Sequence, residues 1–517
     1  MPLFSRRNVK VETFLKRCTE RRVHSRIRAH ELCVVISEHM NKAYMHAVLC
    51  DEHVLITEYA PRTLTAAVSF RRVRNIQLYV RERNEGSAEE LRKFTSTHVI
   101  SSLDPETLNL FRTPHPPNHP LLYSTTSPPA SLLTPRDQRS KTLKSTQVPH
   151  RISSALRRLL HRDDGDTGSS GEEREAELHL YIVSQTSRFY LQLRSSWSRF
   201  VIRSTLLLDP VYRRKCRIYA HSSRRKQRPV LSWERTCQLF NQLSSELLQD
   251  QLSVEGLYLL LQELNTAAHR NLTLPTLFWR SGELCAFLVQ TLEENLNSCQ
   301  SLSGVYTPDH MLLRTMIVET LTVMFAETRN EAAKLSLLSS NNGTLVSRML
   351  LALICDPQPQ TQSSVIGSEF QVLMSEYQDA ACSLLFELLL LGHEIHRSFF
   401  ADDVLSAGWI LGVLQTHSHL PSFMIYQAQQ VVLALSDMQG APLSPTQAVL
   451  LFQRCHLLLL CLQHSSLLAQ HLTSRLSEEF RYLLRLSQAE EKLPPRYPIT
   501  SPILCLLVKV LALMLHR

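Results

Sequence analysis

The sequence has 517 residues, of which 44% are hydrophobic and 20% charged, so its length allows for about three domains with sizeable cores. Its 12 cysteines occur without a CxxC pair, which disfavours a disulfide-stabilised secreted protein. The first residues lack the apolar core of a signal peptide, and Pro2 excludes N-myristoylation.

The net charge of +9 averages two halves of opposite sign. Residues 1–231 contain 40 Lys and Arg against 22 Asp and Glu, a net +18. Residues 232–517 contain 16 against 25, a net −9. The cationic half indicates contact with phospholipid, nucleic acid or an acidic protein, and the acidic half of this chain is one candidate.

Residues 1–30 predict a basic N-terminal helix, and residues 31–82 carry the alternation that is typical of strands. Apolar or alternating segments follow one another closely, at 33–37, 44–49, 54–59, 68–70 and 76–80. We therefore predict an antiparallel meander, in which Met45, Ala47 and Leu49 form the buried face of a half-buried strand.

Residues 83–176 are rich in Ser, Thr, Pro and charge, a composition that cannot offset the entropy lost on ordering. We predict a disordered insertion there. It contains the amphipathic basic segment HRISSALRRLLHR (150–162), whose composition suits an interfacial helix or a calmodulin-type target. Phosphorylation of Ser153 and Ser154 would weaken any anionic contact of this segment.

Strand alternation returns at 178–183 and 189–193. An amphipathic helix follows, with Trp197, Phe200, Val201 and Leu208 on one stripe. We expect residues 177–209 to complete the domain that begins at 31–82.

Five strands, an insertion, two strands and a closing helix resemble the pleckstrin-homology superfold, a seven-stranded bent sheet capped by a C-terminal helix. Lipid-binding members of that superfold carry several basic residues on the first strand pair and its loop. The corresponding loop here, EHMNKA, offers only Lys42. The resemblance therefore implies a module for protein contact or intramolecular docking more than a specific inositide pocket.

A second resemblance is closer in sequence. CVVISEHMNKAYMHAVLCDEHVLITEYAP (33–61), followed by AVSFRRV (67–73), resembles the start of the vertebrate chromosome 12 open reading frame 56 family. That family is uncharacterised, so this resemblance implies no activity.

The densest positive charge lies in a predicted linker, residues 210–231. Its eight basic residues are Arg213, Arg214, Lys215, Arg217, Arg224, Arg225, Lys226 and Arg228. Such a run suits an anionic membrane, a nuclear import signal or a nucleic-acid patch, or it is simply a solvated linker. Nucleic acid is the less favoured partner, because only Tyr219 interleaves with the charges for base stacking.

From residue 232 to 517 the periodicity is helical throughout. Helix starts are marked at Thr307-Pro308, at Ser444-Pro445 with Gln447, and at Ser501-Pro502. Segments such as AACSLLFELLLLG are apolar nearly all round, so they must be covered on several sides. We predict an all-helical domain, either an armadillo- or HEAT-like solenoid or an irregular bundle, that ends in a buried helix at 503–515 rather than a membrane span.

Catalytic patterns are weak throughout the sequence. His393 and His396 stand three residues apart instead of the four that a metalloprotease helix needs. A cysteine and histidine cluster favours core packing over zinc, and it consists of Cys455, His456, Cys461, His464 and His471. We therefore predict a protein that is not an enzyme and has no cofactor or metal.

These observations favour a cytoplasmic adaptor or scaffold. Its basic pleckstrin-like module would contact an anionic surface or partner, and its helical domain would bind protein. Two alternatives remain: a regulator of small GTPases, and a nuclear protein associated with nucleic acid through the polybasic linker. Peripheral attachment to a membrane is compatible with the adaptor.

Overall fold

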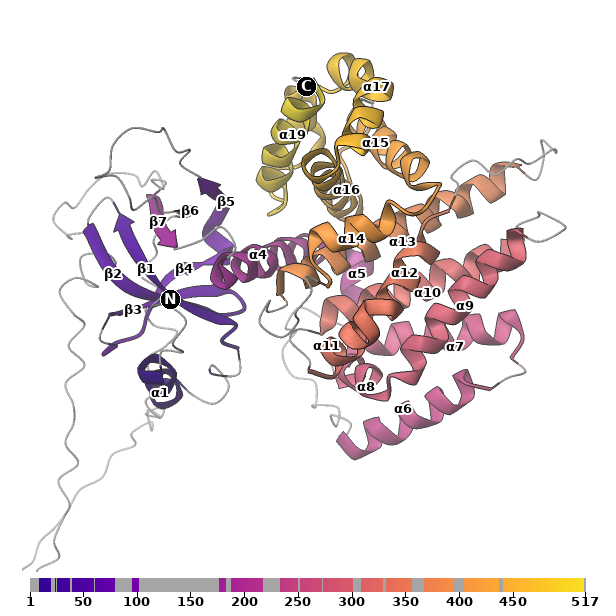
Figure 1. Cartoon of the computed structure of the whole chain (residues 1–517), viewed down its shortest axis with the longest axis horizontal. Coiled ribbons are helices and arrows are strands. Elements are labelled where there is room, and N and C mark those ends of the chain that lie inside the picture. The colour runs from indigo at the N-terminus through magenta and orange to yellow at the C-terminus, as the bar shows by residue number, and fades with distance from the viewer. Residues whose placement is uncertain are drawn as a thin grey trace, which may run out of the picture. The chain divides into compact units, whose positions relative to one another are not determined.

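The structure is a computed structural model of the whole chain (Figure 1). It describes residues 9–19, 24, 26–37, 40–59, 61–79, 95–101, 176–182, 187–216, 233–249, 252–271, 273–300, 308–328, 332–355, 367–394, 404–436 and 440–515. The chain divides into two compact units, each described here by itself. The sheet unit comprises residues 1–73 and 78–183, and the helical unit comprises residues 74–77 and 184–517.

Among its described residues, the sheet unit contains one helix, one short 3-10 turn, η1 (Phe70–Arg72), and a seven-stranded sheet, of which residues 74–77, in the last strand of the sheet order, group with the helical unit. The elements are α1 (Val9–Cys18), β1 (Ala29–Ser37), β2 (Met40–Leu49), β3 (His53–Glu58), β4 (Thr65–Ser69), β5 (Val73–Tyr79), β6 (Thr95–Ser101) and β7 (Ala176–Ile182). The strand order is β4-β3-β2-β1-β7-β6-β5, so the first strand pairs with the last. The predicted N-terminal antiparallel sheet is confirmed.

Strand β2 departs from the prediction of a half-buried strand, because every residue from Met45 to Leu49 is buried. Helix α1 is the reason. Its Val11 and Leu15 form a cluster with Val48 and with residues flanking it, so the face that we expected to meet solvent is covered. The basic helix predicted within residues 1–30 therefore contributes apolar residues to the core of this unit.

Two further expectations are corrected. Strand β6 lies within residues 83–176, which we predicted to be wholly disordered, and it pairs with β7 along its whole length. The rest of that insertion, including residues 150–162, lies outside the described residues. The segment 189–193 is helical instead of extended. The spacing of its apolar residues fits a helix as well as a strand, and Ser187 caps the helix by accepting the N–H of Tyr190 at 3.3 Å.

That helix, α4 (Arg188–Leu206), belongs by its contacts to the helical unit, whereas the sequence suggested that it caps the sheet. It packs against α13 (Gly367–Glu394) and α16 (Pro445–His464). Arg199 of α4 forms a buried ion pair with Glu387 of α13, with 2.5 Å between Nη1 and Oε2.

The other helices of this unit confirm the predicted helical remainder. They are α5 (Pro210–Lys215), α6 (Trp233–Leu247), α7 (Val254–Arg270), α8 (Thr273–Ser281), α9 (Glu283–Gln300), α10 (Pro308–Glu327), α11 (Ala332–Ser339), η3 (Ser340–Gly343), α12 (Thr344–Leu353), α14 (Ala407–Leu414), α15 (Leu420–Ser436), α17 (Ser466–Leu483), α18 (Leu486–Lys492) and α19 (Thr500–Leu515). Every third helix forms a row in which each member contacts the next: α7, α10, α13, α16 and α19 (Figure 1).

The most apolar helices lie inside this unit, as their composition requires. In α13, the run from Ala380 to Leu391 is almost entirely buried. The predicted terminal helix is α19, and the apolar residues on one of its sides are buried. Among the described residues, only α16 is long and apolar enough to cross a membrane. Within its most apolar window, 67% is buried against the protein, as in the core helix of a helical domain.

Candidate functional site

The first described part of the polybasic run is helix α5, which begins for clear local reasons. Asp209 is its N-cap and accepts the N–H of Val211 at 2.7 Å, and Pro210 occupies the first helical position. Its last turn consists of Arg213, Arg214 and Lys215. Cations at this position interact favourably with the negative end of a helix.

The inner side of α5 is fixed to α7. The Tyr212 ring meets the edge of the His269 ring, with 6.0 Å between centroids and 84° between planes. Nε of Arg270 donates a hydrogen bond to the carbonyl of Lys215 at 3.4 Å. Burial, followed by the nearby Lys215 charge, lowers the pKa of His269 to about 4, and burial raises the pKa of Tyr212. The start of the predicted linker is thus a docked helix.

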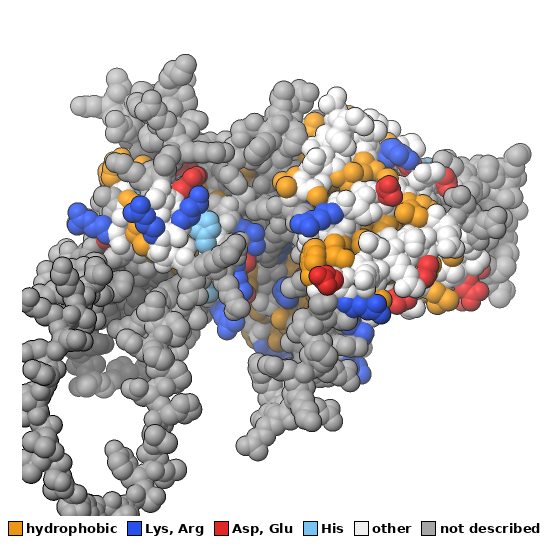
Figure 2. Space-filling model, turned by 90° about the horizontal axis from the view of Figure 1, so that it is seen from below, with side chains coloured by type: hydrophobic (Ala, Val, Ile, Leu, Met, Phe, Trp, Pro, Cys, Tyr) orange, Lys and Arg blue, Asp and Glu red, His pale blue; other side chains and the backbone are white. Residues whose placement is uncertain are grey.

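The outer side of α5 combines exposed apolar and cationic groups. Val211 is 63% exposed, and Leu208, just before the helix, is 42% exposed. Arg213, Arg214, Lys215 and Arg270 are exposed beside them. We call these six residues the α5 surface: Leu208, Val211, Arg213, Arg214, Lys215 and Arg270. In Figure 2, basic and hydrophobic side chains lie side by side on the face shown of the helical unit.

Acidic residues of the helical unit neutralise only part of this charge. Arg203 of α4 pairs with Glu327 at 3.8 Å. Lys215 lies close enough to Glu319 to lower its pKa, although burial dominates and raises it. Among the described residues, no carboxylate lies within ion-pair distance of Arg213 or Arg214. Both arginines are exposed.

The other predicted residues do not join this surface in the structure. Arg217, Arg224, Arg225, Lys226 and Arg228 lie outside the described residues. Lys42, predicted in a loop, is part of strand β2 in the sheet unit. Sequence reasoning missed the two apolar members of the surface and Arg270. The Asp209-Pro210 start signalled the helix, but nothing in the sequence links Arg270 to Lys215.

The cysteine and histidine cluster of the sequence lies largely in the packed interior of the helical unit. The thiols of Cys455 and Cys461 are buried, and burial raises the pKa of each to about 12. His456 packs against the rings of Phe452 and Phe386, with centroids 4.5 and 5.4 Å away. His393 lies in the last turn of α13, and His396 lies outside the described residues. No three His, Cys, Asp or Glu side chains among those described could hold one metal ion.

The buried cations likewise connect helices. Nη2 of Arg314 in α10 donates to the carbonyl of Ala352 at 3.3 Å and to the hydroxyl of Tyr377 at 3.0 Å. Nζ of Lys334 donates to the carbonyls of Phe325 and Thr328 at the end of α10, at 3.2 and 3.1 Å. Lysine so placed stabilises carbonyls that a helix end leaves without partners.

The sequence matches a family profile described as a protein of unknown function, DUF4551, over residues 5–81 and 79–513. The chain belongs to this family. Family relatives include the human "Uncharacterized protein C12orf56", which is 28% identical over 618 aligned residues and 98% of each chain. The mouse "Uncharacterized protein C12orf56 homolog" is 35% identical over 66% of this chain and 67% of its own length. The resemblance to the chromosome 12 open reading frame 56 family is therefore confirmed. No solved structure matches the chain.

Proposed function

We propose that the protein is a non-enzymatic adaptor that attaches peripherally to anionic membranes through its α5 surface and holds a protein ligand on its helical unit. The observation that carries the membrane part is the exposure of Val211 and Leu208 beside Arg213 and Arg214, which have no carboxylate within ion-pair distance among the described residues. An element that lies in a lipid interface gains from apolar and cationic side chains together.

The energetics favour weak, reversible attachment. Each Lys or Arg close to an anionic leaflet contributes about 1 kcal/mol, and burying an aliphatic side chain such as valine contributes roughly 1.5–3 kcal/mol at most. Three exposed cations in α5 and one valine that is 63% exposed therefore favour weak, reversible binding. The remaining five basic residues of the run would add to this attraction.

Lipid explains these residues better than nucleic acid does. A phosphate backbone would use the arginines but would leave Val211 and Leu208 in water. No aromatic side chain among the described residues of α5 is free for base stacking, because the Tyr212 ring packs on His269.

The fold of each unit fits an adaptor. We propose that the sheet is pleckstrin-like, and its support is the strand order, in which β1 joins the meander β2 to β4 with β7. We propose that the helical unit is a solenoid, and its support is the row of every third helix, since repeats in solenoids contact mainly their neighbours. Such rows offer long surfaces for protein ligands.

The test is co-flotation of the full chain with phosphatidylcholine vesicles, with and without phosphatidylserine. We expect binding only to the anionic vesicles. The variant Arg213→Gln/Arg214→Gln/Lys215→Gln should weaken it by roughly 100-fold, from about 1 kcal/mol per charge. The matched control is Arg475→Gln/Arg481→Gln/Arg485→Gln, which removes the same charge from exposed positions of α17 and its C-terminal flank.

The variant Val211→Asn separates charge from apolar insertion, because it leaves the net charge unchanged. It should also weaken flotation, and the weakening should persist at high salt, where the effect of the charges is screened. Equal flotation of both triple variants and the wild type would contradict the proposal. Salt-steep binding to DNA that depends on the α5 arginines but not on Val211 would favour the nuclear alternative.

A further inference from the structure

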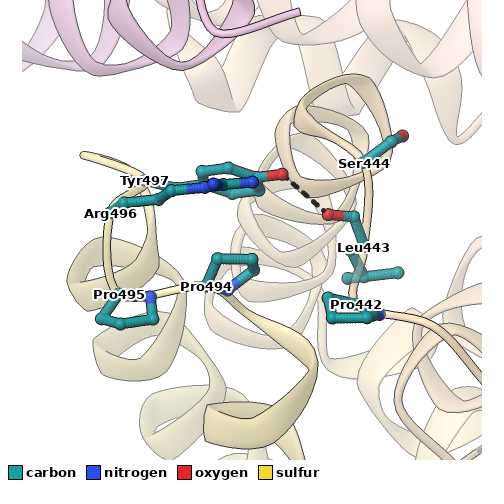
Figure 3. Close-up of a pocket in the computed structure, with 7 residues that line it drawn as sticks. All are labelled: Pro442, Leu443, Ser444, Pro494, Pro495, Arg496 and Tyr497. Atoms are coloured by element: carbon teal, nitrogen blue, oxygen red, sulfur yellow. Dashed lines mark hydrogen bonds between the residues drawn. The ribbon is translucent and has the colours of Figure 1, made fainter.

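A pocket in the helical unit is lined by seven residues, three of which are prolines. It has a volume of about 520 Å³ and lies between the loop that precedes α16 and the loop that precedes α19. Figure 3 shows its lining residues, which are Pro442, Leu443, Ser444, Pro494, Pro495, Arg496 and Tyr497. The volume is in the range of small-ligand and peptide side-chain sites, roughly 300–1,000 Å³.

Hydrogen bonds fix the two walls of this pocket to each other. The Tyr497 hydroxyl donates to the carbonyl of Leu443 at 3.1 Å (Figure 3). The Leu443 N–H donates to the carbonyl of Lys492 at 2.9 Å, and Lys492 Nζ donates to the carbonyl of Gly440 at 2.9 Å. The pocket is therefore formed before any ligand arrives.

The prolines add to this preorganisation. Proline has a fixed φ and no side-chain rotamer freedom to lose, so Pro442, Pro494 and Pro495 can be covered at little entropic cost. Binding sites that are rigid in advance retain more of their contact energy as affinity. A rim of prolines beside a tyrosine is also a surface on which an extended, proline-containing chain can stack.

Arg496 supplies the only charge of the lining. Its guanidinium carbon lies 5.7 Å from the centroid of the Tyr497 ring, and the side chain runs along that ring in Figure 3. The residue is exposed, and among the described residues no carboxylate lies within ion-pair distance of it. A guanidinium oriented by an aromatic ring and lacking a partner is suited to a carboxylate of a ligand.

We propose that this pocket binds a short extended segment of another protein, in which a proline or aliphatic residue lies next to an Asp or Glu. The apolar residue would cover the prolines, and the carboxylate would pair with Arg496. Charge complementarity selects this occupant over a neutral or basic peptide. The proposal rests on the adaptor function in that it locates the protein-binding site of the helical unit, but it does not depend on membrane binding.

The test is selection of a phage library of short random peptides on the full chain, followed by fluorescence anisotropy with the most enriched peptide. We expect enriched peptides to carry an acidic residue beside a proline or aliphatic one. Arg496→Gln should weaken binding by about tenfold or more, the loss of one charge-assisted hydrogen bond. Arg485→Gln removes the same charge from an exposed position outside the pocket and should change binding less than twofold.

Peptides without acidic residues, or equal affinity for wild type and Arg496→Gln, would overturn the proposal. A change of oligomeric state in Arg496→Gln would also overturn it, because the occupant would then be a second copy. The α5 triple variant should keep full peptide affinity, and Arg496→Gln should keep full vesicle binding. Failure of either function therefore leaves the other measurable.

Discussion

At the scale of single residues, the strongest constraint on the helical unit is the ion pair between Arg199 and Glu387. The side chains are only 5% and 6% exposed, and they come from helices that are 188 positions apart in sequence. Arg199 also donates to the carbonyl of Ala326 at 3.4 Å, so one guanidinium connects α4, α10 and α13. The pair is therefore positioned to hold α4 on the helical unit.

Removing one partner of this pair should be costly, because it leaves the other charge buried without compensation. We expect Arg199→Met to lower the free energy of unfolding by about 3–5 kcal/mol. Urea unfolding followed by helical circular dichroism measures this. The exposed pair of Arg481 and Glu478 provides the control, since Glu478→Gln should cost less than about 1 kcal/mol.

The double variant Arg199→Met/Glu387→Leu should recover most of that loss. Both charges are then absent, and apolar groups of similar size fill the space. If the double variant were as unstable as Arg199→Met, packing rather than charge would explain the effect.

His269 makes the helical unit sensitive to acid. Its pKa in the folded state is lowered to about 4 by burial and by Lys215, with the Tyr212 ring also facing it. Between this value and the ordinary histidine pKa near 6.5, the unfolded chain binds the extra proton. Stability contributed by neutral His269 is thus complete above about pH 6.5 and is lost as the pH falls toward 4.

We therefore expect His269→Phe to reduce the fall in stability between pH 6.5 and 4. The wild type should lose at most about 1.4 kcal/mol per pH unit from this group within that window. The measurement is thermal unfolding by circular dichroism at several pH values. An unchanged acid slope in the variant would show that other groups control it; above pH 7 the two proteins should differ by a constant amount.

The basic residues of the helical unit show which contacts a single sequence can predict. Arg213, Arg214 and Lys215 were identified as candidates because their charge is local to one segment. Arg199 and Arg270 were not, because their partners come from distant helices. Charge composition therefore identified part of the candidate surface, whereas its apolar members and its anchors needed the fold.

At the scale of elements, the turn between α11 and α12 is the most demanding backbone of the described chain. Asn341, Asn342 and Gly343 follow one another with φ angles of 49°, 55° and 75°. A Cβ on Gly343 would lie 2.8 Å from a methyl carbon of Val404 and 3.0 Å from the Trp409 ring. Both the conformation and the available space require glycine.

We expect Gly343→Ala to destabilise the helical unit by roughly 1–3 kcal/mol, from strain at positive φ and displacement of the Trp409 ring. Gly408 is the matched control, since a Cβ there meets nothing within 4 Å and the residue is inside α14. Gly408→Ala should be neutral or stabilising by up to about 1 kcal/mol. Equal melting temperatures of the two variants would contradict this account.

Helix starts were the most predictable elements, because their signals are local. Ser444, Pro445 and Gln447 form the predicted capping box of α16, with both hydrogen bonds present. Strands were less predictable. Strand β6 depends on pairing with β7, about eighty positions later in sequence, and the Met45–Leu49 part of β2 is buried on both faces because α1 covers it. The pairing of distant strands and the burial of a strand under a helix depend on tertiary structure, so the periodicity of a segment does not predict them.

At the scale of the whole molecule, the difference from the sequence-based division concerns residues 184–231. Hydrophobic patterning placed α4 at the end of the sheet domain and α5 in a linker, and it began the helical domain at residue 232. The contacts of α4 with α13 and α16, and of α5 with α7, assign both helices to the helical unit. A helix that follows the last strand of one unit can belong to the next unit, and the apolar stripe of the helix does not show which unit it packs against.

This assignment predicts different behaviour for two fragments of the chain. Residues 184–517 retain α4, whereas residues 232–517 lose it and leave Glu387 buried without Arg199. We expect the longer fragment to unfold cooperatively in urea and the shorter one to be less stable by at least the 3–5 kcal/mol expected for breaking the pair. Adding Glu387→Leu to the shorter fragment should recover part of that loss, because it removes the uncompensated charge. If both fragments unfold at the same urea concentration, α4 is not part of the cooperative helical unit, and the boundary at residue 232 is the correct one.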